Sequence, residues 1–385
     1  MPQLKVIAPK LNQRKSPVVD FANKDNIVGV LHQGATFNSV RTIENELGLW
    51  HGDDDGNWAS DNWLREEKWR FDATKMSWAH DSITNGGVGI VDLWNSMGVR
   101  GESINVLILD TGITANNDQF TRENISIIKA NECIDELKVR PNDVAGHGTN
   151  SASIIGATGN DKGQNILYGV APNVNLYIVK FAGSISANPD KFLAGLRMID
   201  PAWPIDIISI SFCYSNVDPL VKEFFTSKVK ESCLVLSALN HPEQGGVSIN
   251  NTQFPAIYDN VIPVAASMQS LKSVLTPCEM INNTNKRNWV FPGEHIKVLN
   301  HRGEYVFADQ SSVATPFAAG VMALFLSYMK KRGIEINKNS IAILINLINQ
   351  SCDSPVQIPN LDGKICFCNP VNAFAQFNKY FKSLL

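Results

Sequence analysis

Ser312 is the residue of this chain whose surroundings most favour nucleophilic chemistry. Residues 313–326, which follow it, are apolar on every face and are therefore typical of a buried helix. Pro316 falls in the first turn, where its missing N–H costs nothing, and Gly333 is a typical helix stop. The start of a helix carries unpaired N–H groups and the positive end of the helix dipole. A serine hydroxyl there could attack a carbonyl, and the resulting oxyanion would be stabilised.

A serine nucleophile needs a base, and His147 is the candidate in this chain. It lies between Gly146 and Gly148, which allow backbone or substrate to approach the imidazole closely. The base in turn needs a carboxylate that orients it. Asp110 follows residues 104–109, which have the composition of a buried strand. Because open α/β sheets bind their ligands at the carboxyl ends of strands, Asp110 is well placed for this role.

The elements that must position these residues alternate between strands and helices from about residue 100. This alternation predicts a parallel sheet with right-handed crossovers, and its apolar, β-branched strands suit a sheet covered on both faces. The predicted strands are residues 104–109, 125–130, 176–181, 205–212, 234–238 and 261–265. The predicted helices are residues 150–157, 190–199, 218–231, 313–331 and 339–348. Asn240 follows a strand as Asp110 does, and its amide could donate to an oxyanion.

Four segments resemble the motifs of the subtilisin-like serine proteases, the subtilases (peptidase S8). They are residues 106–113, 146–149, 237–240 and 311–316, and the resemblance extends from about residue 60 to the C-terminus. One short motif would be weak, but four in the family's order, each at a predicted strand end or helix start, favour this interpretation. The resemblance implies an α/β fold of the subtilisin-like kind, with three α/β/α layers around a mainly parallel sheet. It also implies that Asp110, His147 and Ser312 are catalytic, and that Asn240 contributes to the oxyanion hole.

Alternatives remain at these positions. Ser311 could also begin the helix, although the family's Ser-x-Ala-x-Pro spacing selects Ser312. Asn240 could be an ordinary turn residue. Gln310 and Leu239 stand where the family usually has glycine, and Leu239 could displace Asn240 or intrude on the specificity pocket.

By the same resemblance, a substrate would lie as an extra strand between residues 183–186 and residues 209–215. The residues expected to contact it are Ser209, Ser211, Phe212, Cys213, Gly183 and Leu239. Cys213 stands where the family has glycine, and its side chain would narrow the pocket. We therefore predict a small or restricted residue on the acyl side of the scissile bond.

We expect no metal or other cofactor. The family often binds calcium in the loop after the helix of the catalytic histidine, here residues 159–165, but this loop contains a lysine. Gln119 stands where the family has a partner aspartate. Since hard cations favour several carboxylates, calcium is not favoured at this loop.

The seven cysteines are odd in number and sparsely spaced, which suits a reducing compartment better than a disulfide framework. Cys366 and Cys368 are separated by one residue, which is not a zinc spacing. We interpret them as strand-facing cysteines.

Composition limits the partners of the protein. The chain has 385 residues, is 44% hydrophobic and 18% charged, and carries a formal net charge of −3. There is thus no electrostatic argument for nucleic acid or an anionic membrane, and we expect only a protein or peptide substrate as partner. The first twenty residues lack an apolar signal segment, and no run of about 18 apolar residues predicts a membrane span. If Met1 is the native start, the protein is cytoplasmic; if a signal was removed, it is secreted.

Residues 1–60 are expected to form an N-terminal extension, and residues 61–385 the catalytic domain. Five of the eight tryptophans fall between Trp50 and Trp78, and residues 40–47 have modest helical character. The extension could be an inhibitory pro-region or a permanent layer packed on the catalytic domain. The clustered tryptophans favour the second reading.

The sequence therefore predicts a serine endopeptidase that hydrolyses peptide bonds through a Ser-His-Asp triad and an acyl-enzyme. Two other functions remain open. The departures at Leu239 and Gln310 would suit a catalytically weak peptide-binding protein. An acyl-enzyme could also be passed to an amine, which would make the protein a transpeptidase.

Overall fold

The chain divides into two compact units, Met1–Arg70 and Phe71–Leu385. The computed structural model describes residues 3–6, 10–16, 26–32, 35–38, 41–45, 48–60, 64–66, 69–114, 119–120, 125–130, 142–159, 166–184, 189–214, 218–239, 254–269, 287–352 and 365–382. The two units are described one at a time below.

The second unit is built on an eight-stranded sheet in which every neighbouring pair of strands is parallel. In sheet order the strands are β10 (Ile125–Ala130), β11 (Asn175–Lys180), β9 (Asn105–Asp110), β12 (Ile207–Ile210), β13 (Leu234–Ala238), β14 (Val261–Ser267), β15 (Asn288–Pro292) and β18 (Ile365–Phe367). The predicted α/β class with a parallel sheet is confirmed. All six predicted strands are present, and β15 and β18 are additional.

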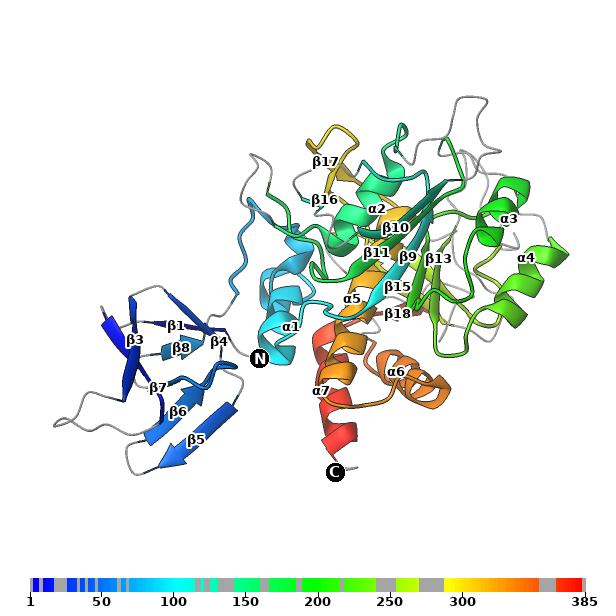
Figure 1. Cartoon of the computed structure of the whole chain (residues 1–385). Coiled ribbons are helices and arrows are strands. Elements are labelled where there is room, and N and C mark those ends of the chain that lie inside the picture. Colours follow the sequence, from blue (N-terminus) through cyan, green and yellow to red (C-terminus); the bar gives the residue numbers. More distant parts are fainter. Residues whose placement is uncertain are drawn as a thin grey trace. The chain divides into compact units, whose positions relative to one another are not determined.

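Helices cover both faces of this sheet, as Figure 1 shows. The helices of one side are α1 (Ile90–Met97), α2 (His147–Gly156), α5 (Ser311–Lys331), α6 (Lys338–Gln350) and α7 (Pro370–Lys382). The other face is covered by α3 (Pro189–Arg197) and by α4 (Pro219–Glu223), which continues into one π-helical turn, Phe224–Lys228. The Asp218 carboxylate caps α4 by accepting the N–H groups of Leu220 and Val221. A short antiparallel pair, β16 (Ile296–Leu299) and β17 (Tyr305–Ala308), completes the unit.

Helix α5 is buried along most of its length, as its all-apolar sequence predicts. By length and composition alone it could cross a membrane, but its side chains lie inside the protein. At Gly320 the helix passes so close to Val170 that an added β-carbon would lie 2.6 Å from the Val170 Cβ. Gly333, with φ at +70°, follows the end of the helix.

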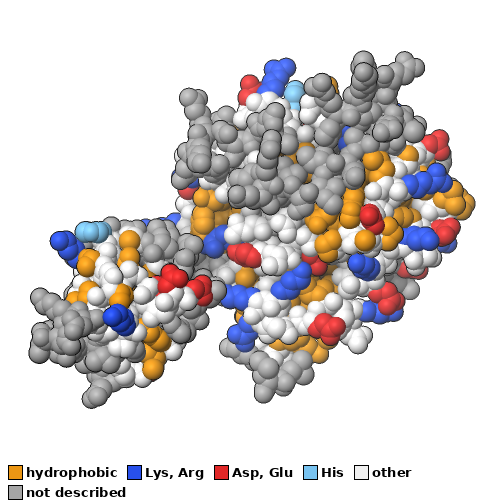
Figure 2. Space-filling model, viewed as in Figure 1, with side chains coloured by type: hydrophobic (Ala, Val, Ile, Leu, Met, Phe, Trp, Pro, Cys, Tyr) orange, Lys and Arg blue, Asp and Glu red, His pale blue; other side chains and the backbone are white. Residues whose placement is uncertain are grey.

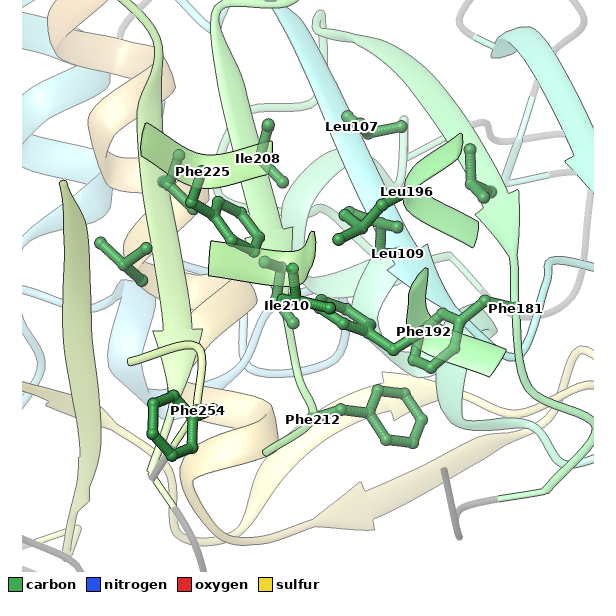
Figure 3. Close-up of a cluster of buried hydrophobic side chains, with 14 of the residues drawn as sticks. Leu107, Leu109, Phe181, Phe192, Leu196, Ile208, Ile210, Phe212, Phe225 and Phe254 are labelled. Atoms are coloured by element: carbon green, nitrogen blue, oxygen red, sulfur yellow. The ribbon is translucent and has the colours of Figure 1, made fainter. Parts of the chain in front are cut away.

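The core on the α3 and α4 face is rich in phenylalanines (Figure 3). The ring of Phe181 packs edge-on against Phe192 at 5.2 Å and against Phe212 at 4.9 Å between centroids. Gly195 on α3 permits this contact, because a β-carbon there would lie 2.5 Å from the Phe181 Cβ. Phe212 follows β12, so this core extends to the carboxyl edge of the sheet.

The cysteines near the C-terminus correct one expectation. Cys352, which follows α6, forms a disulfide with Cys366 on β18, so the prediction that the cysteines are unpaired is wrong for these two. The pairing could not be deduced from spacing, because it depends on where α6 ends relative to the edge strand. Cys368 remains a free, buried thiol.

The first unit is all-β in the residues that the structure describes. Its two antiparallel sheets have the strand orders β4-β1-β8 and β3-β2-β7-β6-β5. The strands are β1 (Gln3–Val6), β2 (Lys10–Arg14), β3 (Ile27–His32), β4 (Thr36–Asn38), β5 (Arg41–Asn45), β6 (Gly48–Gly52), β7 (Trp58–Ser60) and β8 (Leu64–Glu66). Phe37, Trp50 and Ala59 are buried. The helical character expected at residues 40–47 is wrong, because β5 pairs along its length with β6 and that pairing outweighs a weak local preference.

Candidate active site

Asp110 and His147 meet at the carboxyl edge of the sheet. Asp110 is the last residue of β9 and is fully buried, and His147 is the first residue of α2. The Asp110 Oδ1 atom lies 2.7 Å from His147 Nδ1. The same oxygen accepts the N–H of Thr111 at 2.7 Å, and Oδ2 accepts the hydroxyl of Ser151 at 3.0 Å. Three donors therefore hold the carboxylate in one orientation toward the imidazole.

The bond to Asp110 also sets the protonation of His147. Because a carboxylate accepts, Nδ1 carries the proton and Nε2 is the basic nitrogen. Burial of the ring alone would lower its pKa, but the charge and hydrogen bond of Asp110, together with the charge of Asp143, raise it by more. The pKa of His147 therefore lies above its ordinary value of 6.5. With 19% of its side chain exposed, the imidazole remains accessible.

Asp143 is a site residue that the sequence reasoning missed. It is 2% exposed, and its carboxylate accepts four hydrogen bonds. Oδ1 accepts from the Thr111 hydroxyl at 2.7 Å and the Gly146 N–H at 2.8 Å. Oδ2 accepts from the N–H and the hydroxyl of Thr149, both at 2.7 Å. Asp143 thus ties the loop after β9 to the first turn of α2, and an acidic residue shortly before a predicted helix start was the available signal.

Glycines allow these two segments to touch. A β-carbon at Gly148 would lie only 2.1 Å from the carbonyl oxygen of Gly112, so no other residue fits there without a backbone shift. Gly112 itself has φ at +109°. The Gly148 N–H donates to the Thr111 hydroxyl at 2.9 Å, which continues the network of Asp143. The glycines beside His147 predicted a close approach by backbone or substrate, and at Gly148 it is the backbone of Gly112 that approaches.

The start of α5 distinguishes the two candidate serines. Ser311 is 4% exposed, and its hydroxyl donates to the carbonyl of Leu239. Ser312 is half-buried, and its carbonyl accepts the hydroxyl of Ser211 at 2.9 Å. Ser311 is thus engaged in the protein interior, whereas Ser312 lies nearer the surface. Gln310, just before them, has φ at +90° and ψ at 178°, a backbone conformation that normally requires glycine.

Ser211 and Phe212 connect the serine to the histidine. Ser211 bonds the carbonyl of Ser312, and the ring of the next residue, Phe212, lies 5.2 Å from the imidazole of His147. Two adjacent residues after β12 therefore contact both candidate catalytic segments.

The other predicted substrate contacts differ in exposure. The Ser209 side chain is enclosed in the sheet at 1% exposure, and Leu239 is equally buried. Cys213 is half-buried, and Gly183 is exposed. Asn240 and residues 185–186 and 215 lie outside the described residues.

The loop in which the family often binds calcium, residues 159–165, falls largely outside the described residues, which include only its Gly159. Gln119 is buried, and its side-chain oxygen accepts the N–H of Leu167 at 3.0 Å. Its carbonyl accepts the N–H of Thr158 at 3.0 Å. This residue therefore serves in local hydrogen bonding where the family has an aspartate.

The family model of the subtilases matches residues 101–348, well over half of the chain. The chain belongs to the subtilase family. It is 29% identical over 240 residues to the major intracellular serine protease of Bacillus subtilis (strain 168), which covers 62% of this chain and 72% of that protein. It is 30% identical over 236 residues to an intracellular serine protease of Paenibacillus polymyxa, covering 60% of this chain and 68% of that protein.

Solved structures show the same fold. The prenylagaramide maturation protease PagA superposes with a TM-score of 0.57 at 19% identity, over 74% of this chain and 98% of that one. A mutant of the protease domain of PatA gives 0.56 at 20% identity, over 73% and 98%. The fold and family predicted from the sequence are confirmed, and this subtilase is a serine protease that acts on peptides or proteins.

Proposed function

We propose that this subtilase is an endopeptidase that cleaves peptide bonds through an acyl-enzyme on Ser312. The observation that carries the proposal is the 2.7 Å hydrogen bond between Asp110 Oδ1 and His147 Nδ1, which fixes a base at the carboxyl edge of the sheet. Ser211 and Phe212 link this base to the start of α5, where Ser312 lies. The proposal therefore rests on a fixed base, an available hydroxyl and the helix start that carries it.

In the proposed reaction, Ser312 Oγ attacks the carbonyl carbon of the scissile bond while His147 Nε2 takes its proton. The imidazolium that forms is stabilised by the Asp110 carboxylate, which also keeps the ring in the correct tautomer. His147 then protonates the leaving amine as the C–N bond breaks. Water, deprotonated by the same nitrogen, attacks the ester carbon and releases the acid and free Ser312.

The oxyanion of each tetrahedral intermediate would be held at the N-terminus of α5. The N–H of Ser312 lies in the first turn of that helix, where the positive end of the dipole favours negative charge. The amide of Asn240 is the proposed second donor. Removing one such donor in subtilisin lowers turnover by about 10²–10³.

The substrate is proposed to be an extended peptide segment, with a small residue favoured on the acyl side of the scissile bond beside Cys213. On the face in Figure 2, basic and acidic side chains are interspersed over the described part of the second unit. This mixture of charges supports the expectation of no nucleic-acid or membrane partner. The two relatives described above, from Bacillus subtilis and Paenibacillus polymyxa, are named as intracellular proteases, which supports a cytoplasmic location. No metal or cofactor is needed for the proposed reaction.

A fluorophosphonate probe tests the proposal, since the attacking serine oxygen forms a phosphonate ester and expels fluoride. We expect the wild type and the matched control Ser311→Ala to be labelled, and Ser312→Ala to stay unlabelled while its circular dichroism is unchanged. Peptide mapping by mass spectrometry should place the label on Ser312. Folded wild-type protein that takes no label would support a peptide-binding protein instead.

Product analysis separates hydrolysis from acyl transfer. With an internally cleaved peptide and an added primary amine, an endopeptidase gives mainly the free acid. A product that carries the amine in place of water would support the transpeptidase. Cleavage confined to terminal residues would contradict the assignment as an endopeptidase.

A further inference from the structure

Three cysteine sulfurs lie close together beside β18, the strand at one edge of the sheet, and outside the candidate active site. Cys352 follows α6, Cys366 lies on β18 and Cys368 comes just after that strand. Their Sγ atoms all lie within 4.8 Å of one another. The carbonyl oxygen of Ile348 in α6 lies 3.3 Å from Cys352 Sγ and 3.9 Å from Cys366 Sγ. Separate elements thus bring three soft donor atoms close together, and none of the three cysteines belongs to the proposed catalytic residues.

The disulfide accounts for only two of these sulfurs. Cys368 Sγ lies 3.6 Å from Cys366 Sγ, and the Cys368 side chain is buried. Its thiol donates weakly to the carbonyl of Cys366 at 3.4 Å. The third sulfur therefore has no evident role while the disulfide is intact.

We propose that reduction of this disulfide converts Cys352, Cys366 and Cys368 into a zinc-binding site. A thiol reductant supplies two electrons and two protons to the S–S bond and leaves two thiols. One Zn²⁺ then binds the three sulfurs as thiolates, and three protons are released to solvent. The disulfide and the zinc site are alternative states of the same residues.

The distances and ligand types fit zinc. With Zn–S bonds of about 2.3 Å in tetrahedral geometry, two bound sulfurs are roughly 3.8 Å apart. Cys366 and Cys368 already lie 3.6 Å apart, so mainly the half-buried Cys352 must reorient. In the part of the chain that the structure describes, no carboxylate or imidazole joins the cluster. Thiolates select zinc over hard cations such as calcium or magnesium.

Room for a fourth ligand exists beside one of the three cysteines, Cys368. A space of about 50 Å³ lies beside Cys368, larger than the ~10–15 Å³ that one water needs. Ser267 also lines it, is 1% exposed, and its hydroxyl has no hydrogen-bond partner among the described residues. Zinc with three protein ligands commonly keeps water in the fourth position, and Ser267 could bond that water.

The site would also strengthen a weak part of the fold. β18 has three residues and, among the described strands, pairs only with β15, at the edge of the sheet. Zinc would join this strand to the end of α6. The spacing of Cys366 and Cys368 does not predict a zinc site, but Cys352, which is 14 residues upstream of Cys366, completes the set.

The test uses the full chain without a polyhistidine tag, reduced under anaerobic conditions, loaded with Zn²⁺ and desalted. Elemental analysis should find one zinc per chain in the reduced wild type and in Cys233→Ser, a control at a free cysteine elsewhere. We expect zinc affinity to fall at least tenfold in Cys368→Ser, and the oxidised wild type to bind none. Reduced, folded wild type without zinc would overturn the proposal, as would a Cys368→Ser variant with unchanged affinity.

A measurement on the wild type covers the case in which a variant fails to fold. Thiol alkylation followed by mass spectrometry should show that Zn²⁺ slows modification of Cys352, Cys366 and Cys368 in the reduced protein. Alkylation of Cys233 should be unaffected. Equal alkylation rates with and without Zn²⁺ at the three cysteines would contradict the proposal.

Discussion

The two sides of the candidate active site are built differently. On the Asp–His side, Asp110 and the neighbouring Asp143 accept seven hydrogen bonds between them. Glycine backbones interlock at Gly112 and Gly148. On the nucleophile side, Gln310 occupies a glycine-type conformation before Ser312. The difference indicates that saturated polar contacts hold the base rigidly, whereas the nucleophile follows a residue in a strained backbone conformation.

A second feature of the nucleophile side is a buried imidazole beneath α5. His80 is 3% exposed, and its ring lies 6.0 Å from Phe317 of α5 and 5.9 Å from Trp94. Among the described residues, neither ring nitrogen has a hydrogen-bond partner of good geometry. The buried carboxylates on one side are thus fully bonded, while a buried imidazole on the other is not.

The largest expected effect on stability concerns this imidazole. Burial lowers the pKa of His80 to about 4, although backbone groups of Gly169 and Ser77 act in the opposite direction. In the unfolded chain the pKa returns to about 6.5, so the unfolded state binds more protons between these values. Stability should therefore fall by roughly 3 kcal/mol as the pH drops from about 6.5 to 4.

The measurement is urea denaturation at several pH values in wild type and His80→Leu. The variant should lose most of the pH dependence in this window, because the titrating group is gone. An equally steep loss of stability in His80→Leu would show that other groups are responsible.

The next largest effect is expected on kcat, when a side chain is added where the backbones of Gly112 and Gly148 touch. Gly148→Ala would place a β-carbon 2.1 Å from the Gly112 carbonyl oxygen and force the start of α2 to move. Because misplacing a catalytic group by about 1 Å can cost 10²-fold, kcat on a peptide substrate should fall by about that factor. Gly333→Ala serves as the control for a Gly→Ala change, because Gly333 follows the end of a helix and a β-carbon there would contact no other atom. A Gly148→Ala enzyme with wild-type kcat would mean that the contact is not needed.

A smaller effect is expected at Asp143. Asp143→Asn keeps the shape but removes the charge and replaces one of the two acceptor oxygens by an amide NH₂ donor, which would face the N–H of either Gly146 or Thr149. We expect about a tenfold loss of kcat/KM, since His147 is positioned less well. The midpoint of the pH–rate profile should also fall, because the charge of Asp143 contributes to the raised pKa of His147. A loss of activity with an unchanged midpoint would point to a purely structural role.

The smallest effect is a gain of stability on the nucleophile side. Gln310→Gly should relieve backbone strain of 1–3 kcal/mol, offset by the greater chain entropy of glycine. The free energy of unfolding in urea should therefore rise by about 1 kcal/mol. Glu304→Gly, at an exposed position nearby, serves as the control and should not stabilise. Destabilisation by Gln310→Gly would mean that the glutamine side chain makes contacts that outweigh the strain.

The sequence predicted those parts of the protein whose signals are local. Apolar runs located the central strands, and motifs at one strand end and two helix starts indicated Asp110, His147 and Ser312 as candidates. The missed strands are short or atypical: β18 has three residues, and β15 contains an Asn, a Trp and a final Pro. A run of such length carries too little pattern to be separated from a loop.

The features that could not be predicted depend on contacts between distant segments. The strand β5 forms because β6 supplies its hydrogen bonds. The role of Asp143 depends on Thr111, which lies 32 residues away in sequence. The disulfide depends on the end of α6 meeting an edge strand that was itself missed. The spacing of residues along the chain does not predict these contacts between distant segments.

The proposed catalysis depends most directly on Asp110 acting through His147. The pH dependence of kcat/KM in wild type and in Asp110→Asn tests this dependence. The wild-type profile should have its midpoint above pH 6.5, because activity requires neutral His147 and its pKa is raised. In folded Asp110→Asn, kcat/KM should fall by about 10⁴ and the midpoint of the residual activity should move to lower pH. A folded variant within tenfold of wild type and with an unmoved midpoint would contradict the account.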